Sequence, residues 1–346
     1  MTIRVGVVGM GFMGKTHMKI YSNNKRAKLV AYSDFDARKV AGDVGGAGGN
    51  LGNAQDLGFD PKSLKAYQKP EDLFADKDVD LVDICLPTYV HAEYVIKALS
   101  AGKHVLCEKP LTVDMKDADR IVKAVKKAKG FMMPAHCMRF WPEWTWLKDA
   151  VVSKRYGAVQ SAIFRRFAST PTWTASNWVL QPELSGSALF DLHIHDTDFV
   201  RYVFGNPKAV FSAGNGGKAT RNGIDHVITT YLYKDPRLLV NAEGGWNADA
   251  AYGFTMRYTV VFDKATADFD LGREGKVLML HKQGAKEPEV VKTSAKNGWE
   301  EEIEYFLACI QKGIAPRVIT ALEARNSVAL VHCELKSIKK RKPVKV

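Results

Sequence analysis

The sequence predicts an α/β protein with two domains: a doubly wound parallel sheet at residues 1–130, then an α+β domain with a large, mostly antiparallel, open sheet at residues 131–346. Three observations support this division. Short apolar, β-branched runs alternate with helical stretches up to residue 130, as in parallel sheets with helical crossovers. After Pro142, strand-like runs follow one another without such helices, as in antiparallel sheets. A length of 346 residues also suits two domains.

The first domain opens with a strand, a glycine-rich turn, a helix and a second strand, and the alternation then continues. Strands separated by helices imply right-handed crossovers and parallel pairing. The predicted strands are 3–9, 28–33, 79–86, 104–107 and 131–135, and the predicted helices are 17–23, 91–101 and 117–129.

The second domain begins with a helix at 143–153, and two helices at 300–312 and 322–336 close the chain. Between them we expect a largely antiparallel sheet. Its predicted strands include 159–167, 209–213, 226–233, 238–244, 258–262 and 277–280.

Composition and charge argue against several classes of protein. The chain is 46% hydrophobic and 25% charged, as ordinary globular proteins are. No apolar run approaches the roughly 18 residues of a membrane span, and no leader precedes the first strand, so we expect a cytoplasmic protein without a membrane partner. Of the last eleven residues, six are Lys or Arg, which supplies about half of the net charge of +12. We interpret them as a solvated terminus and expect no nucleic-acid partner.

A G-x-G-x-x-G motif lies between the first strand and the first helix. It consists of Gly9, Gly11 and Gly14, with Phe12 and Met13 between the last two. In this context it is typical of the dinucleotide-binding Rossmann fold: the first glycine permits a tight turn, the second lets the backbone approach a pyrophosphate, and the third lets helix and strand pack closely. The helix N-terminus receives the phosphates, so we predict that these five residues bind the cofactor.

Asp34 follows the second strand, 20 residues after Gly14. A carboxylate at this place hydrogen-bonds the adenosine ribose of NAD and repels the 2′-phosphate of NADP. Arg38, just beyond the strand, keeps NADP open as an alternative, because an arginine can bind that phosphate. The sequence therefore favours NAD.

Six glycines crowd into residues 42–52. We interpret this stretch as a flexible surface insertion. A phosphate-binding loop is the alternative, but neither a preceding strand nor a following Lys-Ser/Thr supports it.

Two polar groups of residues are candidates for catalysis. Lys109, in Glu108-Lys109-Pro110, directly follows a predicted strand and so lies at the carboxyl edge of the parallel sheet, where ligands bind. The proline keeps its backbone extended. Asp191 and His195 are four residues apart and share one face if their segment is helical. A neutral imidazole suits removal of a hydroxyl proton near neutral pH.

His193 raises the possibility of a metal site together with His195. On a helix it is rotated by about 200° from Asp191, away from the shared face, which favours a structural role. No third ligand has a suitable spacing, so we predict no metal.

These motifs, in this order, resemble the Gfo/Idh/MocA oxidoreductase family, which includes sugar and inositol dehydrogenases. The resemblance spans nearly the whole chain, and its most specific parts are Glu108-Lys109-Pro110 and the D-x-x-x-H-x-x-D pattern at 191–198. The chain departs from the family at His193 and Ser187, where glycine is usual. Further matching segments are 86–91, 102–105, 139–142 and 186–198.

The resemblance implies an NAD(P)-dependent dehydrogenase acting on a CH–OH group of a sugar, cyclitol or glycoside. Lys109, Asp191 and His195 would form its catalytic set and bind the substrate, with the first two holding the reacting oxygen and the histidine moving the proton. The resemblance adds further predicted cofactor-binding residues: Leu86, Pro87, Thr88, His91, Glu108 and Lys109. Candidates for the substrate pocket are Arg139, Trp173, Asn177 and Trp178.

The family likeness also implies sheet-to-sheet packing into a homodimer or homotetramer. Two other functions remain open. One is a redox-neutral glycosidase or lyase that uses tightly bound NAD and releases no NADH. The other is a non-catalytic, ligand-sensing regulator on the same scaffold, which only the basic tail supports.

Overall fold

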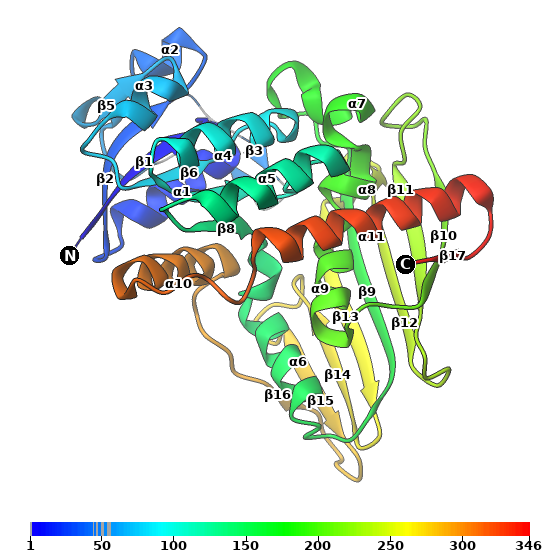
Figure 1. Ribbon diagram of the computed structural model, residues 1–346. Helices are drawn as coiled ribbons and strands as arrows, with labels where there is room; N and C mark the ends of the chain where they lie inside the picture. The colour runs from blue at the N-terminus through cyan, green and yellow to red at the C-terminus, as the bar shows by residue number, and fades with distance from the viewer. Residues whose placement is uncertain (1, 44, 46–47, 50–51, 54–56) are drawn as a thin grey trace. The chain divides into compact units, whose positions relative to one another are not determined.

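The computed structural model describes residues 2–43, 45, 48–49, 52–53 and 57–346. The chain divides into two compact units (Figure 1). The first consists of residues 1–137, 172–178 and 299–328, and the second of residues 138–171, 179–298 and 329–346. The units are therefore not contiguous in sequence, unlike the division at residue 130 that the sequence predicts.

The first unit contains a parallel sheet whose described strands run in the order β5-β2-β1-β6-β7-β8. The chain moves outward from β1 in one direction and from β6 in the other, which makes the gap between them the topological switch point. The strands are β1 (Ile3–Val8), β2 (Ala27–Ser33), β5 (Lys65–Tyr67), β6 (Leu81–Ile84), β7 (His104–Glu108) and β8 (Met132–Ala135).

Helices cover both faces of this sheet. Right-handed crossovers in opposite directions place α1 on one face and the later crossover helices on the other. In α4 the apolar positions Ala92, Val95 and Leu99 recur three and four residues apart and are buried, which explains why the helix forms. The helices are α1 (Phe12–Ser22), α2 (Ala37–Val40), α3 (Pro70–Ala75), α4 (His91–Ser100) and α5 (Met115–Lys127).

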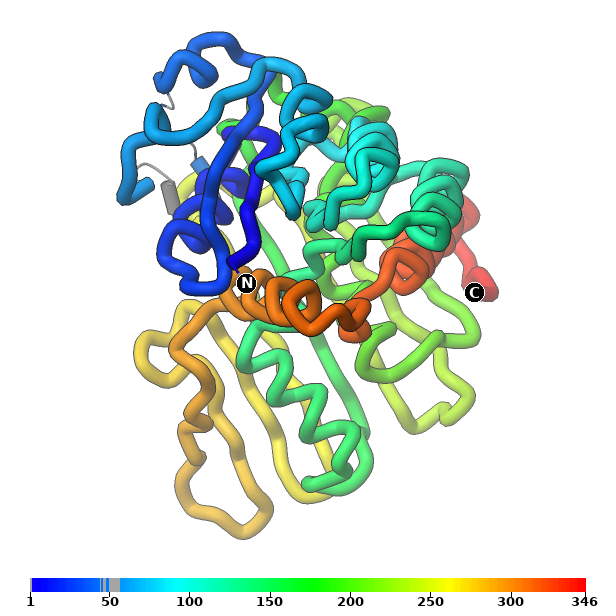
Figure 2. Tube along the Cα trace, turned by 60° about the vertical axis from the view of Figure 1, so that its left-hand side comes forward, coloured from blue at the N-terminus to red at the C-terminus, as the bar shows by residue number. Residues whose placement is uncertain are grey.

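A helix from the far end of the chain, α10 (Gly298–Lys312), completes the first unit. Figure 2 shows it, in orange, beside the blue N-terminal segment. Arg26 donates to Glu304 at 2.6 Å and to Gln311 at 2.6 Å, and Trp299 meets the ring of Phe12 edge-on at 6.4 Å.

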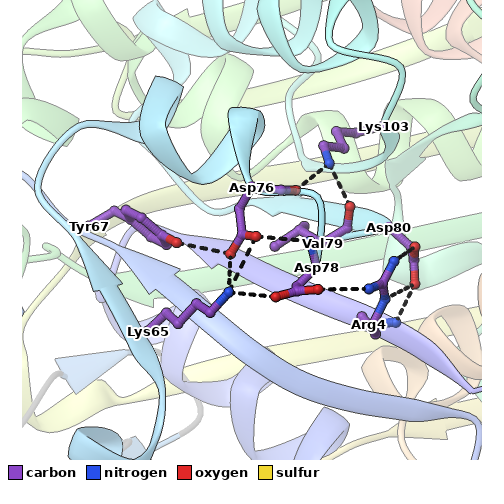
Figure 3. A network of polar contacts seen from close by, with 8 residues as sticks. All are labelled: Arg4, Lys65, Tyr67, Asp76, Asp78, Val79, Asp80 and Lys103. Atoms are coloured by element: carbon purple, nitrogen blue, oxygen red, sulfur yellow. Dashed lines mark hydrogen bonds and ion pairs between the residues drawn. The ribbon is translucent and has the colours of Figure 1, made fainter.

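Charged side chains at the amino ends of the parallel strands pair with one another (Figure 3). Arg4 makes a two-pronged contact with Asp80 at 2.9 and 2.7 Å. The ammonium of Lys103, which is 8% exposed, donates to the backbone oxygens of Asp76 and Val79 at 2.6 Å each. The charges at this edge are thus satisfied locally, and the edge is opposite to the one that carries the glycine motif.

The second unit contains a sheet whose described strands run in the order β16-β15-β14-β13-β9-β12-β11-β10-β17. Every described pairing is antiparallel except that of β9 with β12. The two sheets together confirm the predicted fold class. The strands are β9 (Val159–Ser169), β10 (Ala209–Asn215), β11 (His226–Leu232), β12 (Leu239–Ala248), β13 (Phe254–Phe262), β14 (Ala265–Asp270), β15 (Leu278–Lys282), β16 (Glu289–Val290) and β17 (Val344–Lys345).

An aromatic core lies between this sheet and its helices. Trp144 is fully buried and meets Phe199 edge-on at 4.7 Å and Phe164 at 5.6 Å. Burial of these rings contributes to the hydrophobic driving force for folding of this unit. Its helices are α6 (Pro142–Val152), α7 (Pro182–Ser185), α8 (Ser187–Asp191), α9 (Ile194–Phe204) and the second part of α11 (Ala321–Lys340).

The opposite face of this sheet carries exposed apolar side chains. Alternation along β11 buries Val227, Thr229 and Tyr231 and leaves Ile228 and Leu232 outside, as the two-residue period of a strand requires. Phe211, Ile163 and Leu239 on neighbouring strands are also exposed.

The glycine-rich stretch at 42–52 contains a short antiparallel pair, β3 (Gly48–Gly49) with β4 (Gly52–Asn53). Residues 44, 46–47 and 50–51 lie outside the described part of the chain, and the predicted surface insertion stays a prediction there. None of the described helices is both long enough and apolar enough to cross a membrane.

Candidate functional site

The glycine motif forms the turn between β1 and α1. Gly9 has φ +98°, and a Cβ there would lie 2.5 Å from the backbone oxygen of Cys85. A Cβ on Gly14 would lie 1.8 Å from the oxygen of Gly9, so only glycine allows the helix to pack this closely. At Gly11 a Cβ would meet no described atom within 4 Å, and this residue, at the N-cap of α1, offers no side-chain cap to the first turn. The open space and the uncapped N–H groups of residues such as Phe12 and Met13 fit a bound pyrophosphate.

Asp34 stands at the end of β2 beside this turn. Its Oδ2 accepts from the backbone N–H of Met10 at 2.7 Å, and its Oδ1 accepts from the N–H of Asp36 at 2.9 Å. Lys39 Nζ lies 3.2 Å from Oδ2. Arg38 instead pairs with Asp36 at 2.7 Å and is largely exposed. The carboxylate is held in one orientation, as a ribose-binding group must be.

The segment after β6 forms the other side of the switch point. Leu86, Thr88 and His91 are buried, and Pro87 is partly exposed. The ring nitrogens of His91 lie 2.8 Å from the oxygen of Leu86 and 2.9 Å from that of Pro110. This histidine therefore ties the loop after β6 to the loop after β7, and its predicted contact with the cofactor stays a prediction.

Lys109 follows the last residue of β7 and is partly exposed. Its backbone N–H donates to Oε2 of Glu108 at 3.0 Å, and its peptide bond to Pro110 is cis. Glu108 itself is only 6% exposed, and its Oε1 lies 3.5 Å from Nε2 of His17. The structure thus presents the lysine at the carboxyl edge and turns the glutamate into the unit.

A segment from the middle of the chain, 172–178, belongs to the first unit. Trp178 meets the ring of Tyr89 at 6.3 Å, next to the loop after β6. Trp173 is partly exposed, whereas Asn177 is exposed. Ser176 and Asn177 have φ values of 53° and 49°, a left-handed conformation that costs non-glycine residues energy and is enriched at functional sites.

Asp191 and His195 lie in the second unit, on either side of a break between two helices. Asp191 ends α8, and α9 begins at Ile194. The N–H of His193 donates to the oxygen of Ala188, five residues back, and the N–H of His195 donates to that of Leu192, three residues back. The segment is therefore not one continuous helix, which was the condition for a shared face, because the hydrogen-bond ladder widens and then tightens across it.

The two accessible side chains are nevertheless four residues apart, one on each side of the break. Asp191 and His195 are both partly exposed, and the three residues between them are buried. Their roles stay a prediction, as does that of Lys109 in the first unit.

Three consecutive residues after His195 anchor α9 from different directions. Asp196 accepts from Arg166 of β9 at 2.9 Å, Thr197 donates to Glu334 of α11 at 3.0 Å, and Asp198 accepts from Arg139 at 2.8 Å. Asp196, Thr197 and Asp198 are all 0% exposed. Sequence reasoning missed the first two, although three polar residues in a row within an apolar helix are a signal for buried polar partners.

Arg139, a candidate for substrate binding, lies in this buried network. Its Nε and a terminal nitrogen each bond a different oxygen of Asp198 at 2.8 Å, and its guanidinium lies 4.3 Å above the ring of Tyr202. Both charged side chains are 1% exposed. This placement supports an anchoring role, and contact with the substrate stays a prediction.

His193 is fully buried and faces Glu334, with 3.5 Å between Nε2 and Oε2. Burial lowers the pKa of His193 to about 3, and burial raises the pKa of Glu334 to about 8, although Tyr231 and Thr197 donate to its carboxylate. At neutral pH the imidazole is therefore neutral and the carboxyl group largely protonated.

We expect Glu334→Gln to stabilise the protein increasingly as the pH rises from 5 to 9. A carboxyl group with a folded pKa of about 8 and an ordinary value of 4.5 favours folding least above pH 8, because there the folded state must bury the charge. The difference in Tm between variant and wild type should grow across that window by several degrees, because each pKa unit corresponds to about 1.4 kcal/mol. Glu287→Gln, at an exposed position, should show no such trend, and a flat difference for Glu334→Gln would contradict the assignment.

The chemistry of each half is now defined. The first unit offers an open glycine turn with uncapped N–H groups, the oriented carboxylate of Asp34 and a lysine at one sheet edge. The second offers a carboxylate at the end of α8 and an imidazole in the first turn of the anchored helix α9. A cation, a carboxylate and an imidazole are the groups required to hold an oxygen and move its proton.

Comparison with known proteins identifies the family. The family described as "Oxidoreductase family, NAD-binding Rossmann fold" matches residues 3–136, and the "GFO/IDH/MocA C-terminal domain" matches residues 144–268. The chain is 27% identical over 354 residues to myo-inositol 2-dehydrogenase of Thermotoga maritima, which covers 99% of this chain and 98% of the relative. It is 28% identical over 361 residues to inositol 2-dehydrogenase of Rhizobium meliloti, covering 100% of both chains.

A solved structure of levoglucosan dehydrogenase in complex with NADH and levoglucosan has the same fold. Its TM-score is 0.85 at 20% identity, with 100% of both chains covered. With the glycine turn, Asp34 and the two matched domains, these findings establish that the chain belongs to the Gfo/Idh/MocA family of oxidoreductases and is an NAD-binding enzyme.

Proposed function

We propose that this enzyme transfers a hydride between NAD and a hydroxyl-bearing carbon of a sugar, cyclitol or glycoside. The observation that carries this proposal is the retention of Lys109, Asp191 and His195 in a chain whose full-length relatives are inositol dehydrogenases. The accessible carboxylate and imidazole on either side of buried His193 support it.

NAD, when bound, accepts the hydride. The protein must therefore hold the substrate hydroxyl and remove its proton as the hydride leaves. His195 takes this proton in oxidation and returns it in reduction. Lys109 and Asp191 hydrogen-bond the reacting oxygen, and the ammonium stabilises developing alkoxide charge.

Two partly exposed rings support a polyol as the substrate. Trp173 and Trp178 offer flat apolar surfaces to the C–H face of a sugar ring, and the exposed Asn177 between them offers a donor and an acceptor to hydroxyl groups. These residues and the catalytic set form the proposed substrate contacts.

The test is a panel of sugars, cyclitols and glycosides with NAD⁺ and with NADP⁺, followed at 340 nm. A dehydrogenase produces stoichiometric NADH with its best substrate. A redox-neutral glycosidase or lyase converts substrate, measured by chromatography, without net NADH, and that result would replace the proposal by this alternative.

Asp34→Ser should weaken the preference for NAD⁺ over NADP⁺ by at least tenfold in kcat/KM. The variant loses a charged hydrogen-bond acceptor for the ribose, worth about 1.5–3 kcal/mol, and no longer repels the 2′-phosphate. Lys39, now freed from its contact at 3.2 Å, would favour that phosphate. Arg237→Ser, which removes an exposed guanidinium from the second unit, is the matched control, and an unchanged cofactor ratio in Asp34→Ser would refute the assignment.

We also propose that the protein is a homo-oligomer assembled through the open face of its nine-stranded sheet. The exposed apolar side chains of β9 to β12 support this, because apolar side chains that gather on an exposed face favour an interface. Ile228→Lys should shift the mass in light scattering to that of the monomer, and an unchanged assembly would exclude this face.

A further inference from the structure

A buried polar cluster in the first unit connects the glycine-motif helix to the residue before Lys109. It comprises His17 and Tyr21 of α1, Asp83 of β6, Glu108 of β7 and Glu302 of α10. His17, Asp83 and Glu302 are 0% exposed, Tyr21 is 1% and Glu108 is 6% exposed.

His17 is the centre of the cluster. Its Nδ1 lies 2.8 Å from Oδ2 of Asp83, an oxygen that also accepts from the hydroxyl of Tyr21 at 2.9 Å. This short contact assigns a donated N–H to Nδ1 and fixes the ring. Nε2 then faces Oε1 of Glu108 at 3.5 Å, which is an ion-pair contact and not a hydrogen bond.

Glu108 also contacts the backbone of Lys109. Its other oxygen, Oε2, accepts the backbone N–H of Lys109 at 3.0 Å. Successive side chains of an extended chain point to opposite sides, so a glutamate held toward α1 directs the following lysine away from the interior.

The charges explain why the glutamate does not turn outward. Burial opposes a charge on His17, but Asp83 and Glu108 outweigh it and raise the pKa of the imidazole. Burial, reinforced by Glu108 and Asp83, raises the pKa of Glu302 well above its usual value, and its carboxyl group has no hydrogen-bond partner among the described residues. Burial raises the pKa of Glu108 as well, but the charges of His17 and Lys109 oppose that rise, so the imidazole attracts the Glu108 carboxyl group inward.

We propose that His17 and Glu108 are positioning residues for Lys109: Asp83 clamps His17, His17 holds Glu108, and Glu108 fixes the backbone from which the lysine reaches the reacting oxygen. This inference rests on the proposed function of Lys109. It gives Glu108 a role toward the lysine rather than toward the cofactor, and it links Lys109 to α1, the helix that receives the pyrophosphate.

The test compares Glu108→Ala with Glu108→Gln in the full-length enzyme on its best substrate. The alanine variant should lose about 10- to 100-fold in kcat, because small misplacements of a catalytic group cost that much, with KM for NAD⁺ within about threefold. The glutamine variant keeps an oxygen for the Lys109 N–H but loses the charge that His17 attracts, so it should recover part of the turnover. Equal kcat values in wild type and Glu108→Ala, or no rescue by glutamine, would overturn the proposal.

His17→Asn provides the second variant if Glu108→Ala does not fold. The asparagine amide can replace Nδ1 toward Asp83 but leaves nothing opposite Glu108, so kcat should fall while KM for NAD⁺ holds. Wild-type turnover in this variant would refute the chain of contacts. Lys103→Met, at the opposite sheet edge, is the control for general loss of stability and should keep the kcat of the wild type.

Metal analysis of the purified protein separates this network from a coordination site. Donor atoms of His17, Glu108 and Glu302 lie within 4.8 Å of one another. We expect no stoichiometric ion and no change of Tm with EDTA, and a bound ion would overturn the proposed contacts of His17 with Glu108. Lys109→Met separates failure of the proposed function from failure of the positioning role. Wild-type turnover in Lys109→Met refutes the proposed function. Loss of turnover in Lys109→Met together with full activity in Glu108→Ala refutes only the positioning role.

Discussion

Lys109→Met is expected to lower kcat by about 10²- to 10³-fold on the best substrate. Removing one preorganised donor from a developing oxyanion costs this much, and methionine keeps the length of the side chain without its charge. In the proposed mechanism the lysine acts mainly on the transition state, so kcat and kcat/KM should fall together. Steady-state NADH formation over a range of substrate concentrations measures both constants.

His195→Asn is the companion variant, with an expected loss of about 10²- to 10⁴-fold for a missing general base. If both residues act on one hydroxyl, the double variant should lose far less than the product of the single effects, because groups that act as a unit are not additive. Independent effects, or turnover within tenfold of wild type in either single variant, would contradict the mechanism. Lys103→Met is again the matched control, since it removes a lysine whose partners are backbone oxygens at the far edge.

The part of the enzyme built from local sequence signals was predictable. The turn at Gly9, Gly11 and Gly14 requires glycine for steric reasons that act within a few residues, and the carboxylate of Asp34 stands where the motif implies. The fold class, the family and the NAD cofactor were predictable for the same reason, and all three predictions were confirmed.

Contacts between distant segments were not predictable. Glu302 follows Glu300 and Glu301 in the first turn of α10, where acidic residues are expected at any helix N-terminus. Only its phase with Ile303 and Phe306, both fully buried, marks it as a core position. Its neighbour His17 lies 285 residues earlier, and no local pattern specifies that proximity.

The break between α8 and α9 shows how tertiary packing overrides a helical pattern. His193 sits where glycine is usual in the family, and its ring packs against β12, where a Cβ on Gly244 would lie 2.7 Å from Nδ1. The imidazole fills space beside a strand that has no side chain at that position. The sequence contains both residues but not their proximity, so the widened turn at Asp191 could not be derived from it.

Asp198→Ala is expected to destabilise the protein by about 3–5 kcal/mol, because it leaves the Arg139 guanidinium buried without its partner. Both side chains are 1% exposed and joined by two bonds of 2.8 Å, so water cannot replace the lost carboxylate. The midpoint and slope of urea unfolding, followed by circular dichroism, measure the change.

The double variant Arg139→Met, Asp198→Leu should recover much of this loss, since replacing both charges by apolar groups removes the unpaired ion. Asp235→Ala is the exposed counterpart: its partner Arg237 lies at 2.8 Å, but the two side chains are 48% and 83% exposed, and such pairs contribute about 0–1 kcal/mol. A loss below about 1 kcal/mol for Asp198→Ala would show that the ion pair does not anchor α9. If the loss is large and kcat falls by more than the folded fraction does, the buried neighbours of His195 hold it in position. A loosely held base does not stay within hydrogen-bond reach of the proton that it removes.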